Sequence, residues 1–374
     1  MVENKANIKF WRSGNGKDFL EWSGLSESDL KYNYSTRLFE EFDQKGDHLT
    51  QNWIKNNDFP NIMKSLHDAS TPELPKDYLQ FKSELETIPD WVDWDLIKSG
   101  SELSERSGLN GLLILRNFAL LGGYTFANLT KPLVATGSLE KGAIHRLYNT
   151  LKFWVEVTRS NTSTNEMRLN ACLQTRLIHS ASRLMIQEKI PNWDIEKYGV
   201  PINHADMIAT HIAFTVYYLY GLNQLSFEFS EREEEAVFHL WKYITYLLGV
   251  PVDLIPNNKK EALSFFHFWT NYQLAPDEDA LKLTESLLNE DTPISLFYLK
   301  SINHSMDYVH KSIANYLIDK NIRQDLHIPN LVMPHVIPNL IKLKNKMTSN
   351  IEKQILEGRK HQGIILNDYK NNIK

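Results

Sequence analysis

The sequence predicts an all-α protein built as one large helical domain. Three stretches carry apolar residues at helical spacing, at residues 142–159, 166–189 and 203–222. Further helical runs, separated by proline-bearing loops, follow near residues 231–248, 260–272, 277–289, 293–319 and 338–357. With 374 residues, 42% of them hydrophobic, the chain is long enough to bury a large core.

Charge and cysteine content restrict the class of protein. The formal net charge is -5, so the chain lacks the basic surface that nucleic acid requires, and we expect no nucleic-acid partner. One cysteine, Cys172, cannot form an internal disulfide and is interpreted as a small buried hydrophobe. The first residues contain no signal-like apolar run, and the most apolar windows, 112–121 and 208–222, are shorter than the roughly 20 residues of a membrane span. We therefore expect a cytoplasmic protein without a transmembrane segment.

The helix predicted over residues 166–189 has two different faces. One is apolar, and the other carries Arg168, Cys172, Thr175, Arg176, His179, Arg183 and Ile186. This second face permits two interpretations. It is an ordinary charged surface in contact with water, or it faces an anionic, planar ligand, with the histidine on a metal and the arginines on carboxylates. Haem, with its iron and two propionates, requires that combination of groups.

The preceding helix, predicted over residues 142–159, favours the second interpretation. Its main apolar stripe and its solvent face are both well defined, and Arg146 and Thr150 belong to neither. They share a third stripe with Phe153 and Val157, which directs Arg146 into the protein. A buried guanidinium needs partners, because leaving it unpaired is costly. Two successive helices are thus predicted to direct arginine at a common interior space.

Three motifs in these helices occur in a fixed order. Arg146 is followed by Thr150, then comes the run RLIHSASR at residues 176–183, then GVPIN at residues 199–203. Together they resemble the family of latex clearing protein (rubber oxygenase) and fungal mycophenolic-acid oxygenase. The resemblance covers residues 89–256 and implies an all-helical, haem b dependent oxygenase that cleaves carbon–carbon double bonds in isoprenoid chains.

The resemblance also implies a domain plan and an iron site. Residues 1–88 would form an N-terminal helical wrap, residues 89–256 the oxygenase-like core, and residues 257–374 C-terminal helices packed on that core. A buried haem pocket would lie between the central helices. There His179 would supply the proximal iron ligand through its neutral imidazole.

Six further side chains are placed around this cofactor. Arg176 and Arg183, one turn to either side of the histidine, would pair with the propionates or order the cofactor edge. Arg146 and Thr150 would be the catalytic side chains, hydrogen-bonding dioxygen or the carboxylate edge. His204 and His211 lie about 10 Å apart along one helix face, too far to share one metal ion. We expect them to hydrogen-bond a propionate, a water or a carbonyl in the pocket.

At two positions the chain departs from its rubber-cleaving relatives. Those proteins have a carboxylate base upstream of the arginine motif and a distal lysine before the threonine. Here residues 128–131 contain no carboxylate, and Asn149 precedes Thr150. Three functions therefore stay open. They are oxygenation of an unsaturated apolar substrate, haem binding as a sensor or carrier without turnover, and a cofactor-free helical interaction protein. The lysine-rich tail after Arg359 is expected to be frayed, and the oligomeric state is left open.

Overall fold

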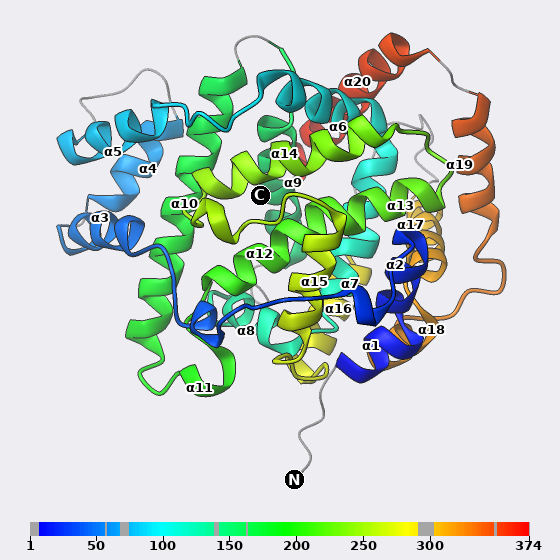
Figure 1. Cartoon of the computed structure of the whole chain (residues 1–374), viewed down its shortest axis with the longest axis horizontal. Coiled ribbons are helices and arrows are strands. Elements are labelled where there is room, and N and C mark those ends of the chain that lie inside the picture. The colour runs from blue at the N-terminus through cyan, green and yellow to red at the C-terminus, as the bar shows by residue number, and fades with distance from the viewer. Residues whose placement is uncertain are drawn as a thin grey trace.

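The computed structural model describes residues 7–56, 58–67, 75–137, 142–161, 164–290, 303–347 and 350–373. Within these ranges all the regular elements are helical, which confirms the all-α prediction (Figure 1). Two short π-helical stretches, η3 (Leu115–Leu120) and η4 (Ala213–Tyr217), interrupt the α-helices of the core.

The helices of the first half are α1 (Asn7–Ser13), α2 (Asn15–Ser23), η1 (Glu27–Asp29), η2 (Thr36–Phe39), α3 (Gln44–Lys55), α4 (Phe59–His67), α5 (Lys76–Glu86), α6 (Trp94–Ile114), α7 (Leu121–Gly123), α8 (Ala127–Ala135), α9 (Ala143–Val157) and α10 (Thr164–Lys189). Those of the second half are α11 (Ile195–Tyr198), α12 (His204–Ile212), α13 (Tyr218–Gln224), α14 (Glu231–Leu247), η5 (Val252–Leu254), α15 (Lys259–Thr270), α16 (Glu278–Leu288), α17 (Asn303–Leu317), α18 (Lys320–Asp325), α19 (Val336–Met347) and α20 (Ile351–Asn372).

The central helices agree with the sequence pattern. The predicted helices 142–159 and 166–189 are α9 and α10, and the apolar run 203–222 forms α12, η4 and α13. Two predictions differ in extent. Residues 293–302 of the run 293–319 lie outside the described residues, and the run 338–357 is divided between α19 and α20.

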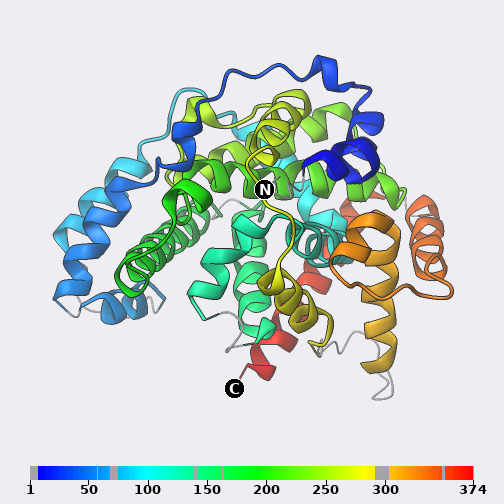
Figure 2. The ribbon, with the colours of Figure 1, turned by 90° about the horizontal axis from the view of Figure 1, so that it is seen from below.

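Figures 1 and 2 show the same order of helices across the molecule. On one side α3, α4 and α5 lie beside α10, and on the other side lie α17, α18 and α19. The helices that follow α10 in the chain, α12 to α15, lie between these two sides. Buried apolar residues from Phe10 to Tyr369 form one connected core. The chain is thus a single helical domain, and its division at residues 88 and 256 remains a prediction.

Buried arginine side chains of α10 join this helix to α9 and to α3. Arg168 of α10 donates from Nε to the carbonyl of Val157 at 2.7 Å and from Nη2 to that of Arg159 at 2.9 Å. These carbonyls lie at the C-terminal end of α9, where helical partners are missing. Arg168 is only 2% exposed, so it fixes the position of α9 against α10 inside the core.

A second connection joins α10 to α3 through two buried ion pairs. Arg176 donates to both carboxylate oxygens of Asp43, at 2.6 and 2.7 Å, and stacks over the Phe81 ring. About two turns further on, Arg183 pairs with Asp47 and donates to the carbonyls of Pro201 and Ile202 at 3.0 Å. Paired carboxylates satisfy these guanidinium groups, so the N-terminal helices are held against α10 by charge as well as by apolar contact.

The last helix contradicts the prediction of a frayed tail. Helix α20 continues through Asn372, and its residues Ile365 and Tyr369 are buried. It crosses α6 closely at Gly358, where a Cβ would lie 1.9 Å from the Glu105 carbonyl oxygen. Beside the crossing, Arg359 donates to the Glu105 carboxylate at 2.7 Å. Apolar residues four apart in the tail therefore bind it to the core despite its lysines.

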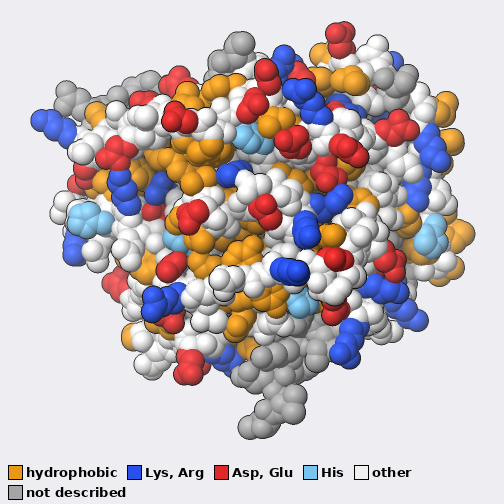
Figure 3. Space-filling view, in the orientation of Figure 1, with side chains coloured by type: hydrophobic (Ala, Val, Ile, Leu, Met, Phe, Trp, Pro, Cys, Tyr) orange, Lys and Arg blue, Asp and Glu red, His pale blue; other side chains and the backbone are white. Residues whose placement is uncertain are grey.

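Charged side chains of both signs are interspersed over the surface. Figure 3 shows lysine and arginine mixed with aspartate and glutamate on the face in view, with no broad basic area. This distribution agrees with the net charge of -5.

Breaking one of the buried ion pairs should destabilise the fold strongly. The substitution Asp47→Ala leaves Arg183, which is 2% exposed, without its carboxylate. We expect the free energy of unfolding to fall by about 3–5 kcal/mol, measured by urea denaturation. Glu21→Ala removes an exposed partner of Lys17 and should cost less than about 1 kcal/mol. Equal small losses in both variants would contradict the assignment.

Candidate active site

A large cavity lies between the central helices. Its volume is about 1320 Å³, above the roughly 300–1,000 Å³ of most small-molecule sites. Most of its wall is apolar and comes from α6, α8, α9, α10, η4, α17, α19 and α20, with Leu113, Leu133, Phe153, Phe214, Trp241 and Ile365 among the lining side chains. A cavity of this size and lining can hold a bulky apolar ligand out of water.

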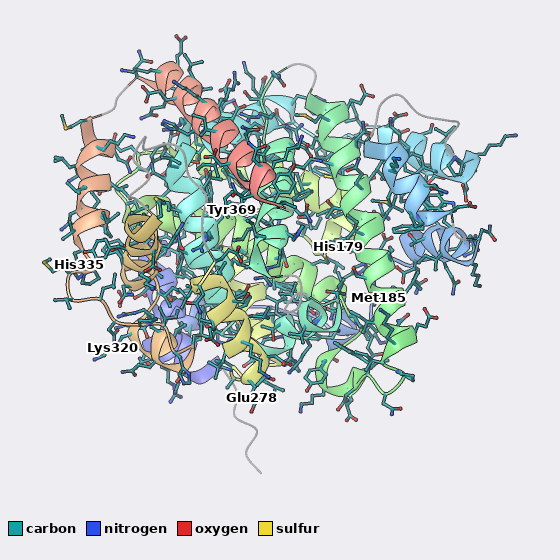
Figure 4. All side chains as sticks on the ribbon, turned by 180° about the vertical axis from the view of Figure 1, so that it is seen from behind. His179, Met185, Glu278, Lys320, His335 and Tyr369 are labelled. Atoms are coloured by element: carbon teal, nitrogen blue, oxygen red, sulfur yellow. The ribbon has the colours of Figure 1, made fainter. Side chains whose placement is uncertain are left out.

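His179 of α10 lies on the wall of this cavity. Its Nδ1 atom is buried and has no hydrogen-bond partner. The pKa of the His179 ring is lowered to about 4, mainly by burial and also by the positive charge of Arg183, while Asp43 acts in the opposite direction. The imidazole is therefore neutral at neutral pH, which is the form that binds a metal. Figure 4 shows His179 on the inner side of α10, toward the other helices of the core.

Arg146 and Thr150 of α9 line the same cavity. Arg146 donates from Nη2 to the hydroxyl of Tyr124, and its guanidinium carbon lies 5.6 Å from the centre of that ring. Its Nε and Nη1 atoms are buried without a partner. Thr150 and the neighbouring Asn149 are exposed as well as lining the cavity. The structure thus brings Arg146, Thr150 and His179 to one space.

Arg176, Arg183 and His204 do not reach the large cavity. They line a separate space of about 10 Å³, together with Asp43 and the other side of the His179 ring. Because Asp43 and Asp47 occupy the two guanidinium groups, these arginines face carboxylates of the chain itself. Burial lowers the pKa of His204 to about 4. The three side chains therefore lie next to His179, on the side of α10 that faces α3.

His211 belongs to the large cavity, one helix away from His179. Its Nδ1 atom lies 3.1 Å from the Thr245 hydroxyl, and its Nε2 atom is buried without a partner. Burial lowers the pKa of this ring to about 3. His204 and His211 share one face of α12 but line different spaces, because about two turns of the helix separate them along its axis.

Sequence reasoning missed several polar residues of the cavity. Arg116, Tyr124 and His310 line it, as do the carboxyl groups of Glu156 and Asp206. Burial raises the pKa of Asp206 to about 6, against the hydrogen bonds from Trp269 and Asn203 that lower it. Arg116 had a visible signal, a lone cation in the apolar window 112–121. A lone cation within a run of apolar residues indicates a polar site inside the protein.

The described residues include no metal site made of protein side chains alone. Within these ranges no group of three or more His, Cys, Asp or Glu side chains is arranged to hold an ion. Burial raises the pKa of Cys172 to about 12, so its thiolate is not available as a ligand. An iron bound at His179 would therefore need a cofactor to supply its remaining ligands.

No single helix of the described ranges is both long and apolar enough to cross a membrane. By length and composition alone, the run Trp94–Gly123 passes such a test together with Ala127–Ala135, across a bend of 100°.

Fold and cavity together define a class, an all-helical protein with a neutral histidine and an incompletely paired arginine facing a large apolar cavity. The model of the family described as ER-bound oxygenase mpaB/B'/rubber oxygenase, catalytic domain, matches residues 113–336. The chain belongs to this family, as its motifs predicted.

Two known proteins are similar to the chain. The rubber oxygenase of Streptomyces sp. (strain K30) is 22% identical over 189 residues, which is 49% of this chain and 45% of that protein. The match thus spans about half the length of this curated relative. The structure of latex clearing protein LCP in the closed state superposes with a TM-score of 0.68 at 14% identity, covering 90% of this chain and 92% of that one. This likeness confirms the fold.

The buried histidines should make the fold sensitive to acid. The folded pKa of His211, about 3, lies below its value of 6.5 in the unfolded chain, so protons bind the unfolded state more tightly. Stability is therefore lost as the pH falls below 6.5. Between about pH 7 and pH 5 this one ring should remove roughly 2 kcal/mol. Urea denaturation at both pH values checks the loss. His211→Asn should flatten the dependence, whereas replacing the exposed His48 by Asn should not.

Proposed function

We propose that this protein is a haem b dependent oxygenase that attacks a carbon–carbon double bond of an unsaturated apolar substrate, of isoprenoid or lipid type. The observation that carries the proposal is the neutral His179 ring on the wall of the large apolar cavity. Membership of the oxygenase family supports the reaction class. A relative named rubber oxygenase supports a long apolar substrate.

The residues present fit haem. The cavity of about 1320 Å³ has room for a planar cofactor and a substrate together, and neutral imidazole rings, among them those of His179 and His211, lie on its wall. His179 would hold the iron through a ring nitrogen. Arg146, with two unpartnered guanidinium nitrogens, is available to dioxygen or to a carboxylate edge of the cofactor. His211, with its unpartnered Nε2, would donate or accept a hydrogen bond in the same space.

Bound haem would supply the redox chemistry that activates dioxygen. The chain's own residues have simpler tasks. Burial keeps His179 neutral, so that the ring nitrogen is a ligand and carries no proton charge. Arg146 presents positive charge, and Thr150 a hydroxyl, to the reacting groups. The apolar wall excludes water and positions a hydrocarbon chain.

Arg176, Arg183 and His204 would influence the cofactor only through His179, its proposed iron ligand. Their guanidinium groups are engaged by Asp43 and Asp47, and they border the small space next to His179. We infer that they fix the rotation of α10 and set the electrostatic surroundings of the imidazole. This is a positioning role of the kind that outer groups have around metal ligands.

A haem-binding sensor or carrier without turnover is the second candidate. Among the described residues, the carboxyl groups on the cavity wall are those of Glu156 and Asp206. Glu156 lies 3.8 Å from the Lys152 ammonium group, and Asp206 accepts hydrogen bonds from Trp269 and Asn203. Both carboxyl groups are thus engaged already, which favours a site without a general base. Aldehyde or ketone products from a panel of unsaturated lipids, with oxygen consumption, distinguish oxygenase from carrier.

Replacing the proposed iron ligand should remove the cofactor. Purified from cells with adequate haem, the wild-type protein should show an intense Soret band, and His179→Ala should lose stoichiometric haem because the proposed iron ligand is removed. Absorption spectra and a haem assay measure the effect, and circular dichroism should still show a helical protein. His48→Ala is the matched control. Wild-type haem content and an unchanged Soret position in His179→Ala would refute the assignment.

Replacing Arg146 should affect activity more than haem content. Removing one preorganised cation from a dry site lowers rates by about tenfold or more, so Arg146→Ala should consume oxygen at least about tenfold more slowly than the wild type. Its haem content should stay within about twofold of the wild type. Arg37→Ala, at an exposed position, is the control. If haem is lost as completely as in His179→Ala, Arg146 instead holds a carboxylate of the cofactor.

A further inference from the structure

The cavity has a second polar region, on η3 and α17. It consists of Arg116 and Asn117 of η3 and His310 of α17. Figures 1 and 2 both show α17 and α10 on opposite sides of the fold. Arg116 and His310 nevertheless line the same cavity as His179. The cavity therefore reaches from α10 to α17, and each of these helices contributes a histidine to its wall.

The cluster is held together by hydrogen bonds through Asn117. Arg116 donates from Nη1 to the Asn117 amide oxygen at 2.7 Å and from Nη2 to the Leu287 carbonyl at 2.8 Å. The amide nitrogen of Asn117 lies 3.0 Å from Nδ1 of His310. These hydrogen bonds hold the three side chains in place. They do not use Nε of Arg116 or Nε2 of His310.

Those remaining atoms lack partners. Arg116 and His310 are both more than nine-tenths buried. The Nε atom of Arg116 and the Nε2 atom of His310 have no hydrogen-bond partner. Arg116 donates to the neutral oxygens of Asn117 and Leu287, and the Tyr369 phenol is a further hydrogen-bonding neighbour. The acidic groups that act on it are the Glu290 carboxylate and the phenols of Tyr369 and Tyr124, and Glu290 accepts from the Ala143 backbone at 3.1 Å. A buried cation with so little compensation is expensive in an otherwise apolar wall.

The local backbone is also unusual at this point. Arg116 and Asn117 lie in the π-helical stretch Leu115–Leu120. Such stretches interrupt regular hydrogen bonding and are frequent at functional sites. The amide nitrogen of Asn117 is bonded to the Leu113 carbonyl at 2.9 Å, which compensates for part of the interruption. The backbone irregularity and the unsatisfied cation coincide, and each points to a ligand independently.

We propose that Arg116 and His310 bind the carboxylate of an elongated, unsaturated apolar acid whose hydrocarbon chain lies along the cavity. This inference rests on the proposed function, since it names the substrate class of the same cavity. A carboxylate accepts hydrogen bonds from both side chains and neutralises the guanidinium, whereas an alcohol of the same length leaves the charge unpaired. The head group of the acid is then held at η3 and α17, and its hydrocarbon chain lies against the apolar wall. The other source of such a carboxylate is a propionate of the cofactor.

Calorimetric titration with geranic acid and geraniol tests the proposal. The two probes share a branched, doubly unsaturated chain and differ in the head group. The haem-loaded wild type should bind geranate at least about tenfold more tightly than geraniol, because a charge-assisted hydrogen bond is lost with the alcohol. Arg116→Gln should reduce the preference to about threefold or less, with unchanged haem content. Lys131→Gln alters a cation that Asp277 and Asp279 already neutralise and should keep the preference.

Two results would overturn the proposal. Equal binding of geranate and geraniol by the wild type would show that no carboxylate site exists, and this comparison needs no variant to fold. Loss of haem in Arg116→Gln to the extent seen in His179→Ala would show that Arg116 holds the cofactor's carboxylate. His310→Phe, which keeps the ring volume, repeats the test if Arg116→Gln is poorly folded. Failure of the proposed function appears separately, as a wild-type protein without a Soret band.

Discussion

The structure depends first on the pairing of two buried arginines with two aspartates across α10 and α3. Arg176 and Arg183 lie one turn to either side of His179 and are held by Asp43 and Asp47. A guanidinium that is 2–7% exposed is tolerable only with such a partner. The pairs therefore fix the position of α10 along its axis and its rotation about that axis. The imidazole between them is directed at the cavity as a result, and the positive charge of Arg183 helps to keep it neutral.

The cavity follows from a balance between apolar walls and a few unsatisfied polar atoms. Most buried polar groups in proteins have partners, and several of the exceptions among the described residues line this one space. Arg116, Arg146, His179, His211 and His310 each leave at least one ring or guanidinium nitrogen unpartnered, and all five line the cavity. A site that keeps its donors unsatisfied is arranged for a ligand with acceptor groups, and its apolar walls select one with a long hydrocarbon part.

Much of this fold was predictable, because helical periodicity is a local property. The stripes of residues 142–159 and 166–189 gave α9 and α10 nearly to their ends. Arg146 lines the cavity, and so do residues of the predicted solvent face of α9 such as Asn149. Partners distant in sequence were not predictable. Asp43 lies 133 residues before Arg176, and a single sequence holds no record of that contact, so the arginines were assigned to propionates. The tail after Arg359 was misjudged for the same reason, since lysines mask the buried Ile365 and Tyr369.

The close crossing of α6 and α20 has a consequence for the dimensions of the cavity. At Gly358 the two backbones touch with no space for a methyl group, so the distance between these helices cannot adjust by small steps. Ile365 and Tyr369, two and three turns further along α20, belong to the cavity wall. The angle at which the last helix leaves this contact therefore determines how long a molecule the protein can enclose. Chain-length selectivity is then a property of backbone geometry at a glycine, remote from any reacting atom.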